Sequence, residues 1–234
     1  PGLAGSLLVG VAYAKALAYV SKKPIIGVNH LEGHAFSAMI EHTVPFPHLC
    51  ITASGGHTAL YLVHDYGTYE ILGSTLDDAA GEAFDKIARL LNLSYPGGPE
   101  IEKRAHALDY RDYFNYPRSM EKSFNFSFSG LKTAVMYDLI KKGAYDLSQK
   151  SLVIDDDLIK SQVASSLLVC IADIFTQKVT LALNTYPEVH AITFVGGVAR
   201  NNYIRNRLTA LCASLNKKLF IPSYEYCTDN AGMI

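Results

Sequence analysis

The chain has 234 residues, of which 49% are hydrophobic and 18% are charged. This composition is typical of a globular protein and excludes a disordered chain, because there is ample apolar surface to bury. The formal net charge of −1 excludes a strong overall positive field for nucleic acid, although a local basic patch stays compatible with it. The four cysteines are scattered without a Cys-x-x-Cys pair, which favours a reducing compartment over a disulfide framework.

The hydrophobic runs and the two ends of the chain indicate whether it crosses a membrane and whether it is a fragment. No hydrophobic run is expected to reach the length of a transmembrane span, since the nearest, residues 163–183, is interrupted by Asp173, Gln177 and Lys178. The chain starts at Pro1 without an initiator methionine or signal peptide, and it stops at Ile234 within an expected element. We therefore expect a fragment, cut at both ends, that does not associate with a membrane.

The first third of the chain predicts two helices separated by a strand, followed by a strand meander. A helix is expected over Leu3–Val20, and a short buried strand over Ile25–Asn29. A second helix is expected over Glu32–His42, which Pro45 and Pro47 end. Three strand-like runs follow, at Leu49–Ala53, Ala59–His64 and Tyr69–Leu72.

The rest of the chain alternates between helices and strands. Asp77 or Asp78 is expected to cap the next helix, because a carboxylate there accepts free backbone amides. The expected helices are Ala79–Leu91, one starting at Pro99 or Glu100, Ser129–Lys141, Leu158–Leu183 and Asn201–Leu215. The expected strands are Ala191–Val195 and Lys218–Ile221. This order indicates an α/β fold with mixed sheets and a lobe boundary near residues 43–50.

Two histidines four positions apart, His30 and His34, form the most informative pattern. If the segment after His30 is helical, both imidazoles lie on one face and can reach one metal ion. The spacing alone favours a surface histidine beside a satisfied core histidine, so a metal site needs a third ligand. Asp229 is the candidate, although such an aspartate is also a common helix N-cap. Imidazole and carboxylate ligands suit Zn2+ or Fe2+, and the order differs from the His-Glu-x-x-His of zincin proteases.

Two glycine-containing turns are candidates for binding a phosphate. Residues 52–58 place two glycines between expected strands, where successive amides can cradle an anion, and His57 is the unexpected residue there. Residues 195–202 combine a strand, two glycines and a helix start, which favours a nucleotide near the helix N-terminus. Each segment also suits an ordinary tight turn. The chain has no Gly-x-x-x-x-Gly-Lys-Ser/Thr loop, which excludes a P-loop NTPase.

Two further segments carry polar groups at regular spacing. Asp78 and Asp85 are seven positions apart on one expected helical face, which is usually just solvated but would bind ribose hydroxyls if Asp85 pointed into a cleft. Residues 126–133 alternate phenylalanines with serines before a helix start, and Lys132 there could serve an anion. For the second segment, the pattern favours a strand–turn–helix packing unit over an anion site.

Taken together, these segments resemble the threonylcarbamoyltransferase family of the tRNA t6A pathway, whose members were once described as O-sialoglycoprotein endopeptidases. The resemblance covers essentially the whole chain, and ordered motifs of this length are very specific. The motifs are His-x-Glu-Gly-His at 30–34, Ser-Gly-Gly-His-Thr at 54–58, Asp-Asp-Ala-Ala-Gly-Glu-Ala-Phe-Asp-Lys at 77–86, Tyr-Pro-Gly-Gly-Pro at 95–99, Phe-Ser-Phe-Ser-Gly-Leu-Lys-Thr at 126–133, Gly-Gly-Val-Ala-x-Asn at 196–201 and Cys-Thr-Asp-Asn at 227–230.

The resemblance implies an actin-like ATPase (ASKHA) fold of two lobes, with mixed β-sheets flanked by helices. Residues 1–48 would form part of the N-terminal lobe with the paired-histidine helix. Residues 49–226 would form the second lobe with the nucleotide-binding loops, and residues 227–234 a segment returning to the metal site. The family's first strand and phosphate loop would precede Pro1, and its last stretch would follow Ile234.

The resemblance also implies the chemistry. The enzyme would transfer the threonylcarbamoyl group from threonylcarbamoyl-adenylate to N6 of adenosine 37 in tRNAs that read ANN codons, forming t6A and releasing AMP. One divalent metal ion, Fe2+ or Zn2+, would bind His30, His34 and Asp229. No catalytic residue is certain, and either His57, the candidate residue, or a water would take the amine proton. The nucleotide-type ligand would be held by Thr52, Ala53, Ser54, Gly55, Gly56, Asp85, Gly98, Glu102 and Asn201.

The implied partners are threonylcarbamoyl-adenylate and the tRNA anticodon loop. A bacterial enzyme would also have a paralogous dimerisation subunit and a small ATPase subunit. The expected location is the cytoplasm, or the mitochondrion in a eukaryote. The alternatives are a metal-dependent O-carbamoyltransferase, which shares the paired-histidine logic, and another ATP-utilising phosphotransferase of the actin fold, which has no use for paired histidines.

Overall fold

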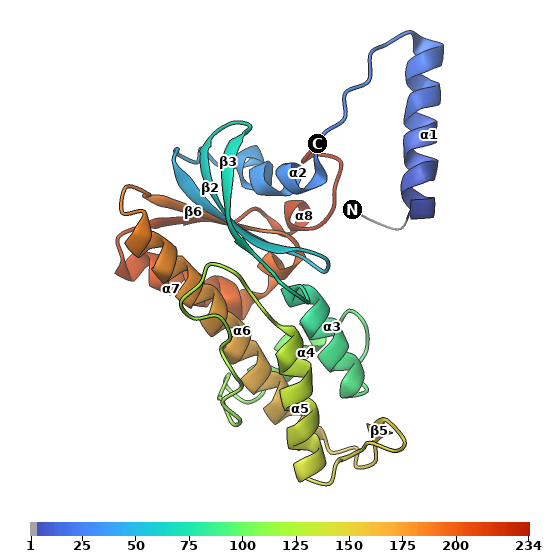
Figure 1. Ribbon diagram of the computed structural model, residues 1–234, viewed down its shortest axis with the longest axis vertical. Helices are drawn as coiled ribbons and strands as arrows, with labels where there is room; N and C mark the ends of the chain where they lie inside the picture. Colours follow the sequence, from blue (N-terminus) through green and yellow to red (C-terminus); the bar gives the residue numbers. More distant parts are fainter. Residues whose placement is uncertain (1–3) are drawn as a thin grey trace.

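A five-stranded mixed sheet forms the centre of the computed structural model, which describes residues 4–234 (Figure 1). The strand order is β3-β2-β1-β6-β7. Strands β1, β2 and β3 form the expected antiparallel meander, whereas β6 and β7 run parallel to β1. The strands are β1 His48–Ala53, β2 Thr58–Asp65, β3 Thr68–Ser74, β6 Ala191–Val195 and β7 Lys218–Phe220.

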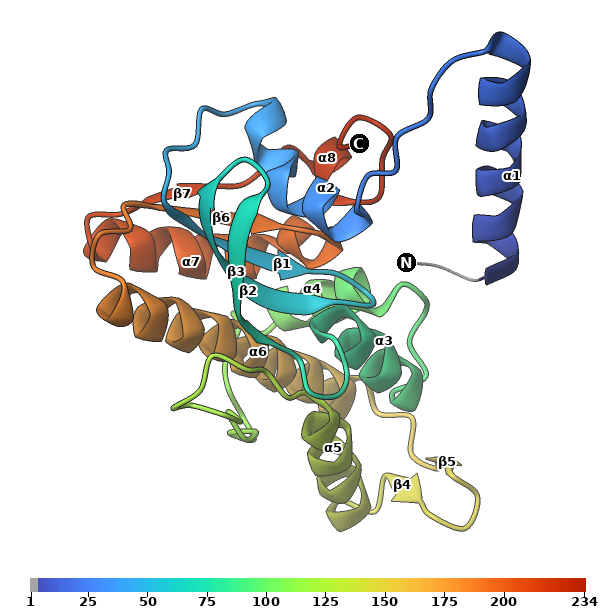
Figure 2. The ribbon, with the colours of Figure 1, turned by 45° about the horizontal axis from the view of Figure 1, so that its top comes forward.

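Helices cover both faces of this sheet (Figures 1 and 2). The α-helices are α1 Ala4–Ser21, α2 His30–Phe36, α3 Ala80–Leu90, α4 Gly97–His106, α5 Ser129–Lys141, α6 Asp157–Thr185, α7 Asn202–Ser214 and α8 Tyr224–Cys227. Two 3-10 turns, η1 Ser37–Ile40 and η2 Gly197–Arg200, and a small ribbon of β4 Tyr145–Asp146 and β5 Ser151–Leu152 complete the described structure.

The alternation of side chains along β1 divides the core between the two faces. Leu49 and Ile51 join the large cluster that includes the long helix α6, whereas Cys50 joins a smaller cluster with Ala35 and Ala38. All six residues of β1 are buried, since successive side chains of a strand point to opposite faces and both faces here are covered. The sheet thus holds α2 on one side and α3, α4, α6 and α7 on the other.

Helices α1 and α6 are both long and apolar enough to cross a membrane by length and composition alone, which corrects the expectation that no run reaches that length. In α6, 72% of the apolar window is buried, so it is the central core helix. No residue of α1 is buried, and the helix stands apart from the sheet (Figure 2). Leu3, the expected first residue of this helix, lies outside the described residues.

The segment Ile25–Asn29 is not a strand, contrary to the sequence prediction. Its apolar side chains are exposed, with Ile26 84% accessible. A strand needs a neighbour for its amides and carbonyls, and no described strand lies beside this segment. The predicted helix Glu32–His42 begins two residues earlier and divides into α2 and η1.

The predicted caps also differ. Neither Asp77 nor Asp78 caps α3, whose N-cap residue is Ala79. Asp77 instead accepts hydrogen bonds from the amides of Phe128 and Ser129, and so caps α5, which is distant in the sequence. Helix α4 begins at Gly97, ahead of the predicted start, because the Gly97 amide donates to the Asp85 carboxylate at 2.7 Å. The lobe boundary at residue 48 stays a prediction.

Candidate functional site

The structure brings His30, His34 and Asp229 together. Nε2 of His34 lies 2.9 Å from Oδ1 of Asp229, and Nε2 of His30 lies 3.3 Å from the same oxygen. The two imidazole rings are 4.6 Å apart and nearly perpendicular. One ligand atom from each residue lies within 4.8 Å of the others, so a single ion can reach all three.

Helix α2 and the C-terminal segment together position these side chains. Asn29 starts α2 by accepting the Leu31 and Glu32 amides, at 2.9 and 3.4 Å, so that His30 and His34 follow on one helical face. A Cβ at Gly33 would lie 3.1 Å from the Met233 carbonyl oxygen. The C-terminal segment therefore passes directly over α2, and this close approach delivers Asp229.

The donor set fits a divalent cation. Two imidazole nitrogens and a carboxylate oxygen suit Zn2+ or Fe2+. The side chain of His34 is 2% accessible and that of Asp229 is 75% accessible, so the site has a closed side and an open side. Burial is the main cause that lowers the pKa of His30, which favours the neutral imidazole that a metal requires.

The glycine hairpin between β1 and β2 lies beside the N-terminus of α3. The Gly81 amide donates to the Ser54 carbonyl at 3.2 Å, and a Cβ at Gly81 would lie 2.8 Å from the Cα of Gly55. Only a residue without a side chain allows this approach. Within residues 4–234, no acceptor takes the amides of Gly55 and Gly56. These free donors can bind an anion.

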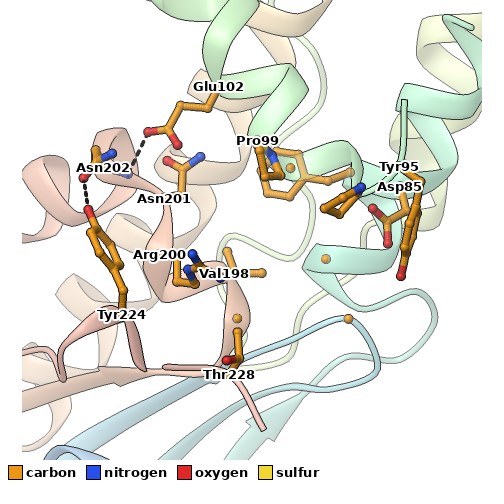
Figure 3. A pocket seen from close by; sticks show the side chains of 16 residues that line it. Asp85, Tyr95, Pro99, Glu102, Val198, Arg200, Asn201, Asn202, Tyr224 and Thr228 are labelled. Atoms are coloured by element: carbon orange, nitrogen blue, oxygen red, sulfur yellow. Dashed lines mark hydrogen bonds between the residues drawn. The ribbon is translucent and has the colours of Figure 1, made fainter. Parts of the chain in front are cut away.

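A cavity of about 650 Å³ opens between this hairpin and the N-terminus of α7 (Figure 3). Of the predicted nucleotide-binding residues, Gly55, Asp85, Gly98, Glu102 and Asn201 line it. The others lie elsewhere. The side chains of Thr52 and Ala53 are buried in the sheet, Ser54 is half-buried and Gly56 is exposed, and none of the four lines the cavity.

Both carboxylates of the cavity are held by backbone amides. Asp85 accepts the Gly97 amide at 2.7 Å, and Glu102 accepts the amides of Asn202 at 2.7 Å and Tyr203 at 3.1 Å. The Asn201 side chain accepts the Ile204 amide at 3.0 Å as the N-cap of α7. These bonds fix the polar groups while leaving each carboxylate a second oxygen for a ligand.

Sequence reasoning missed several residues that line this cavity. Most of them lie inside motifs already identified, and membership of those motifs could have indicated them. They are Gly81, Phe84, Tyr95, Pro96, Pro99 and Gly197. No motif indicated Tyr224. Its hydroxyl donates to the Asn202 side chain, and its ring forms part of the wall (Figure 3).

His57 lies at the end of the glycine hairpin, half-buried, with its amide donating to Oγ of Ser54 at 3.1 Å. Burial lowers the pKa of its imidazole. A lowered pKa keeps the ring neutral at neutral pH, which is the state that can accept a proton.

The cavity and the His-His-Asp cluster are adjacent. Thr228 lines the cavity, and the next residue, Asp229, belongs to the cluster. The fold and site thus define an α/β protein with a candidate nucleotide cavity beside a candidate metal centre. HypF, in a crystal structure of its phosphate- and nucleotide-bound form, matches 96% of this chain with a TM-score of 0.69 at 15% identity, over 36% of its own length. This likeness shows an actin-like ATPase fold and confirms the predicted fold class.

Comparison with known sequences shows the family to which the chain belongs. The model of the tRNA N6-adenosine threonylcarbamoyltransferase family matches residues 1–234. A protein of that name from Thermosipho africanus is 46% identical over 238 residues, and one from Thermodesulfovibrio yellowstonii is 44% identical over 236. Both alignments cover the whole of this chain and 68% of the relative. The chain belongs to the tRNA N6-adenosine threonylcarbamoyltransferase family, as the motifs predicted.

Proposed function

We propose that this protein transfers a threonylcarbamoyl group from threonylcarbamoyl-adenylate to N6 of adenosine 37 in ANN-decoding tRNAs, forming t6A and releasing AMP. Family membership supports the transferase activity on tRNA. The observation that carries the site assignment is the adjacency of Thr228 and Asp229, because it joins the nucleotide cavity to the cluster of His30 and His34.

The donor is a mixed carbamic–phosphoric anhydride and is already activated, whereas the acceptor is an exocyclic amine and a poor nucleophile. The protein therefore has to polarise a carbonyl, hold both reactants in line and stabilise the leaving phosphate. A divalent ion held by His30, His34 and Asp229 would supply Lewis-acid polarisation of the carbamoyl carbonyl.

The glycine hairpin serves the leaving phosphate. The amides of Gly55 and Gly56 have no acceptor among the described residues, and they lie beside the first turn of α3. Of the two, Gly55 lines the cavity and is the donor proposed for the phosphate. An amide that the fold already holds in place needs no reorganisation as negative charge grows on a bound phosphate. Since the hairpin is packed against Gly81, these donors stay in place during transfer.

The far end of the cavity serves the nucleoside. The Asp85 and Glu102 carboxylates are fixed by backbone amides, and their free oxygens can accept hydrogen bonds from the hydroxyls of a ribose. Asn201 presents an amide beside Glu102 (Figure 3). The adenylate would thus lie with its nucleoside toward α4 and α7 and its phosphate toward the hairpin.

The acceptor adenosine lies in an anticodon loop, where its base can turn outward toward the cavity. Either His57 or a water molecule would take the proton from N6. His57 is the candidate residue because it lies on the glycine hairpin and because burial lowers the pKa of its imidazole. A paralogous dimerisation subunit and a small ATPase subunit would accompany a bacterial enzyme. We expect it to act in the cytoplasm, where bacterial tRNA is found.

The competing activities are less well supported. A phosphotransferase of the same fold needs no paired histidines at its nucleotide cavity. An O-carbamoyltransferase would share the histidine pair and differ in its acceptor. Both sequence relatives, from Thermosipho africanus and Thermodesulfovibrio yellowstonii, are named tRNA N6-adenosine threonylcarbamoyltransferase.

The test is reconstitution of the full-length protein with a tRNA transcript lacking t6A and synthetic threonylcarbamoyl-adenylate. Nucleoside mass spectrometry should detect t6A, and a chelator should abolish it. His34→Ala should be inactive, whereas His64→Ala, which alters an exposed histidine paired with Glu70, should retain activity. Wild-type turnover by His34→Ala would refute the metal assignment. Absence of t6A from the wild-type reaction, with the two accompanying subunits added, would refute the proposed reaction.

A further inference from the structure

Tyr95 has an exposed aromatic side chain, and packing holds the backbone next to it in place. Its side chain lines the cavity, and the residue is 84% accessible. Two residues later, Gly97 is buried, and a Cβ there would lie 2.6 Å from Cβ of Ala88, so α4 starts in direct contact with α3. The Gly97 amide is also bonded to Asp85. The ring of Tyr95 is therefore presented to solvent from a backbone that packing holds in place.

Arg200 is the cationic residue among those that line the cavity. It is exposed, and within residues 4–234 its guanidinium makes no ion pair or hydrogen bond. The neighbouring Arg205 differs, since it bonds the Ala199 and Pro222 carbonyls and stacks on Tyr224 at 4.5 Å. The guanidinium of Arg200 lies 5.7 Å from the same tyrosine ring.

The two groups flank the cavity. Figure 3 shows Tyr95 on the side of Asp85 and α3, and Arg200 on the side of Asn201 and Tyr224. The adenylate needs neither of them, because the hairpin amides and the Asp85 and Glu102 carboxylates already offer contacts for its phosphate and ribose. Exposed groups at the rim instead face the larger substrate, which has to approach from solvent.

The overall charge strengthens the case for local contacts. With a net charge of −1, the protein has no general field that attracts RNA, so affinity for an anticodon loop has to come from particular side chains. Single-stranded RNA is commonly held by stacking of a base on an aromatic ring and by a cation on the backbone. A fixed exposed tyrosine and an unpaired arginine across one cavity supply both kinds of contact.

We propose that Tyr95 and Arg200 bind the single-stranded RNA of the acceptor, Tyr95 by stacking on a nucleobase and Arg200 by contacting a backbone phosphate. The assignment rests on the proposed function, because it names the residues that meet the tRNA at that same site. It adds two binding residues and no chemical step.

The experiment compares Tyr95→Leu, Tyr95→Phe and Arg200→Gln in the reconstituted reaction, with the KM for tRNA and the KM for the adenylate measured separately. Tyr95→Leu should raise the KM for tRNA roughly 5- to 150-fold, since a stacked base contributes that much to affinity. Tyr95→Phe, which keeps the ring, should stay within about twofold of wild type. Arg200→Gln should raise the KM for tRNA and reduce the salt dependence of RNA binding by about one phosphate contact.

Matched controls are Tyr137→Leu and Arg89→Gln, which alter an exposed tyrosine on α5 and an exposed arginine on α3 that do not line the cavity. Both should behave as wild type. A second measurement uses an anticodon stem–loop with 2-aminopurine beside the acceptor adenosine. Its fluorescence should be quenched on binding by wild type and by Tyr95→Phe, and not by Tyr95→Leu.

A rise in the KM for adenylate with an unchanged KM for tRNA would overturn the proposal, because it would assign the pair to the donor. Unchanged constants in all variants would also overturn it. Neither result would touch the proposed function, which fails only if the wild-type protein makes no t6A.

Discussion

Glu102 on α4 binds the N-terminus of α7 through Asn202, whose amide donates to Oε1 of Glu102 at 2.7 Å although 100 positions separate the two residues. The same oxygen accepts the Tyr203 amide. A carboxylate at a helix N-terminus satisfies free amides and favours the helix dipole. This single side chain therefore fixes α4 relative to α7 and sets one wall of the cavity.

We predict that Glu102→Ala lowers the free energy of unfolding by about 1–2 kcal/mol, because α7 loses a charged cap. The KM for adenylate should rise in the same variant. Glu102→Gln keeps an acceptor oxygen and should lose less. Urea denaturation measures the stability, and Glu100→Ala on the same helix is the control. Equal stability of Glu102→Ala and the control would contradict the capping role.

Asp229 is expected to act on the metal with little effect on the fold, since its side chain is 75% accessible. Asp229→Ala should lower metal affinity by about 100-fold or more, because a direct ligand is lost. Metal content after dialysis, measured by mass spectrometry, is the readout. Glu225→Ala removes a nearby exposed carboxylate and should leave the content unchanged. Stoichiometric metal in Asp229→Ala would exclude this residue as a ligand.

Gly81 should tolerate no side chain. In Gly81→Ala the new Cβ would lie 2.7 Å from the Ser54 carbonyl oxygen, so the glycine hairpin would have to move. We expect a raised KM for adenylate together with a modest loss of stability. Gly130→Ala is the matched control, because nothing lies within 4 Å of its Cβ and alanine favours helix. Steady-state kinetics of the two variants separate the effect on the hairpin from a general effect of substitution. An equal KM for adenylate in Gly81→Ala and Gly130→Ala would contradict the role of Gly81.

His48 should make stability depend on pH. The residue is fully buried, and burial lowers its pKa to about 4. The unfolded chain, with a histidine pKa near 6.5, then binds more protons between these values, so stability falls as the pH drops from about 6.5 to about 4. The total loss is at most about 3 kcal/mol. His48→Leu should flatten this dependence in urea titrations at several pH values. An unaltered profile in His48→Leu would exclude His48 as the cause.

Asp77 should stabilise α5 rather than α3. Partial burial raises the pKa of its carboxyl, but hydrogen bonds from Ser127, Phe128 and Ser129 outweigh it and lower the pKa to about 2. Asp77→Ala should cost about 1–2 kcal/mol in urea denaturation. The contribution of Asp77 is present above pH 4 and is lost as the pH falls toward 2. Asp78→Ala breaks an ion pair with Lys86 and should cost less stability than Asp77→Ala. A larger loss in Asp78→Ala than in Asp77→Ala would contradict the role of Asp77 as the cap of α5.

Much of the fold was predictable because it depends on near neighbours. Helix Ser129–Lys141 and strand Ala191–Val195 have the predicted bounds, since hydrophobic periodicity and turn residues lie within each segment. The predicted strand at Ile25–Asn29 is wrong because a strand depends on a distant neighbour. Its apolar composition favours a strand, but a strand forms only beside another, and composition says nothing of that neighbour.

The sequence by itself determined the actin-like class, the family and the placing of His30 and His34 on one helical face, because motifs and helical spacing are local properties of the chain. Only the tertiary structure decided that Asp229, 195 positions from His34, lies 2.9 Å from it, that Asp77 caps α5, and that Tyr224 lines the cavity. Such contacts result from the packing of the whole chain, in which the sheet and the close approach at Gly33 bring distant segments together.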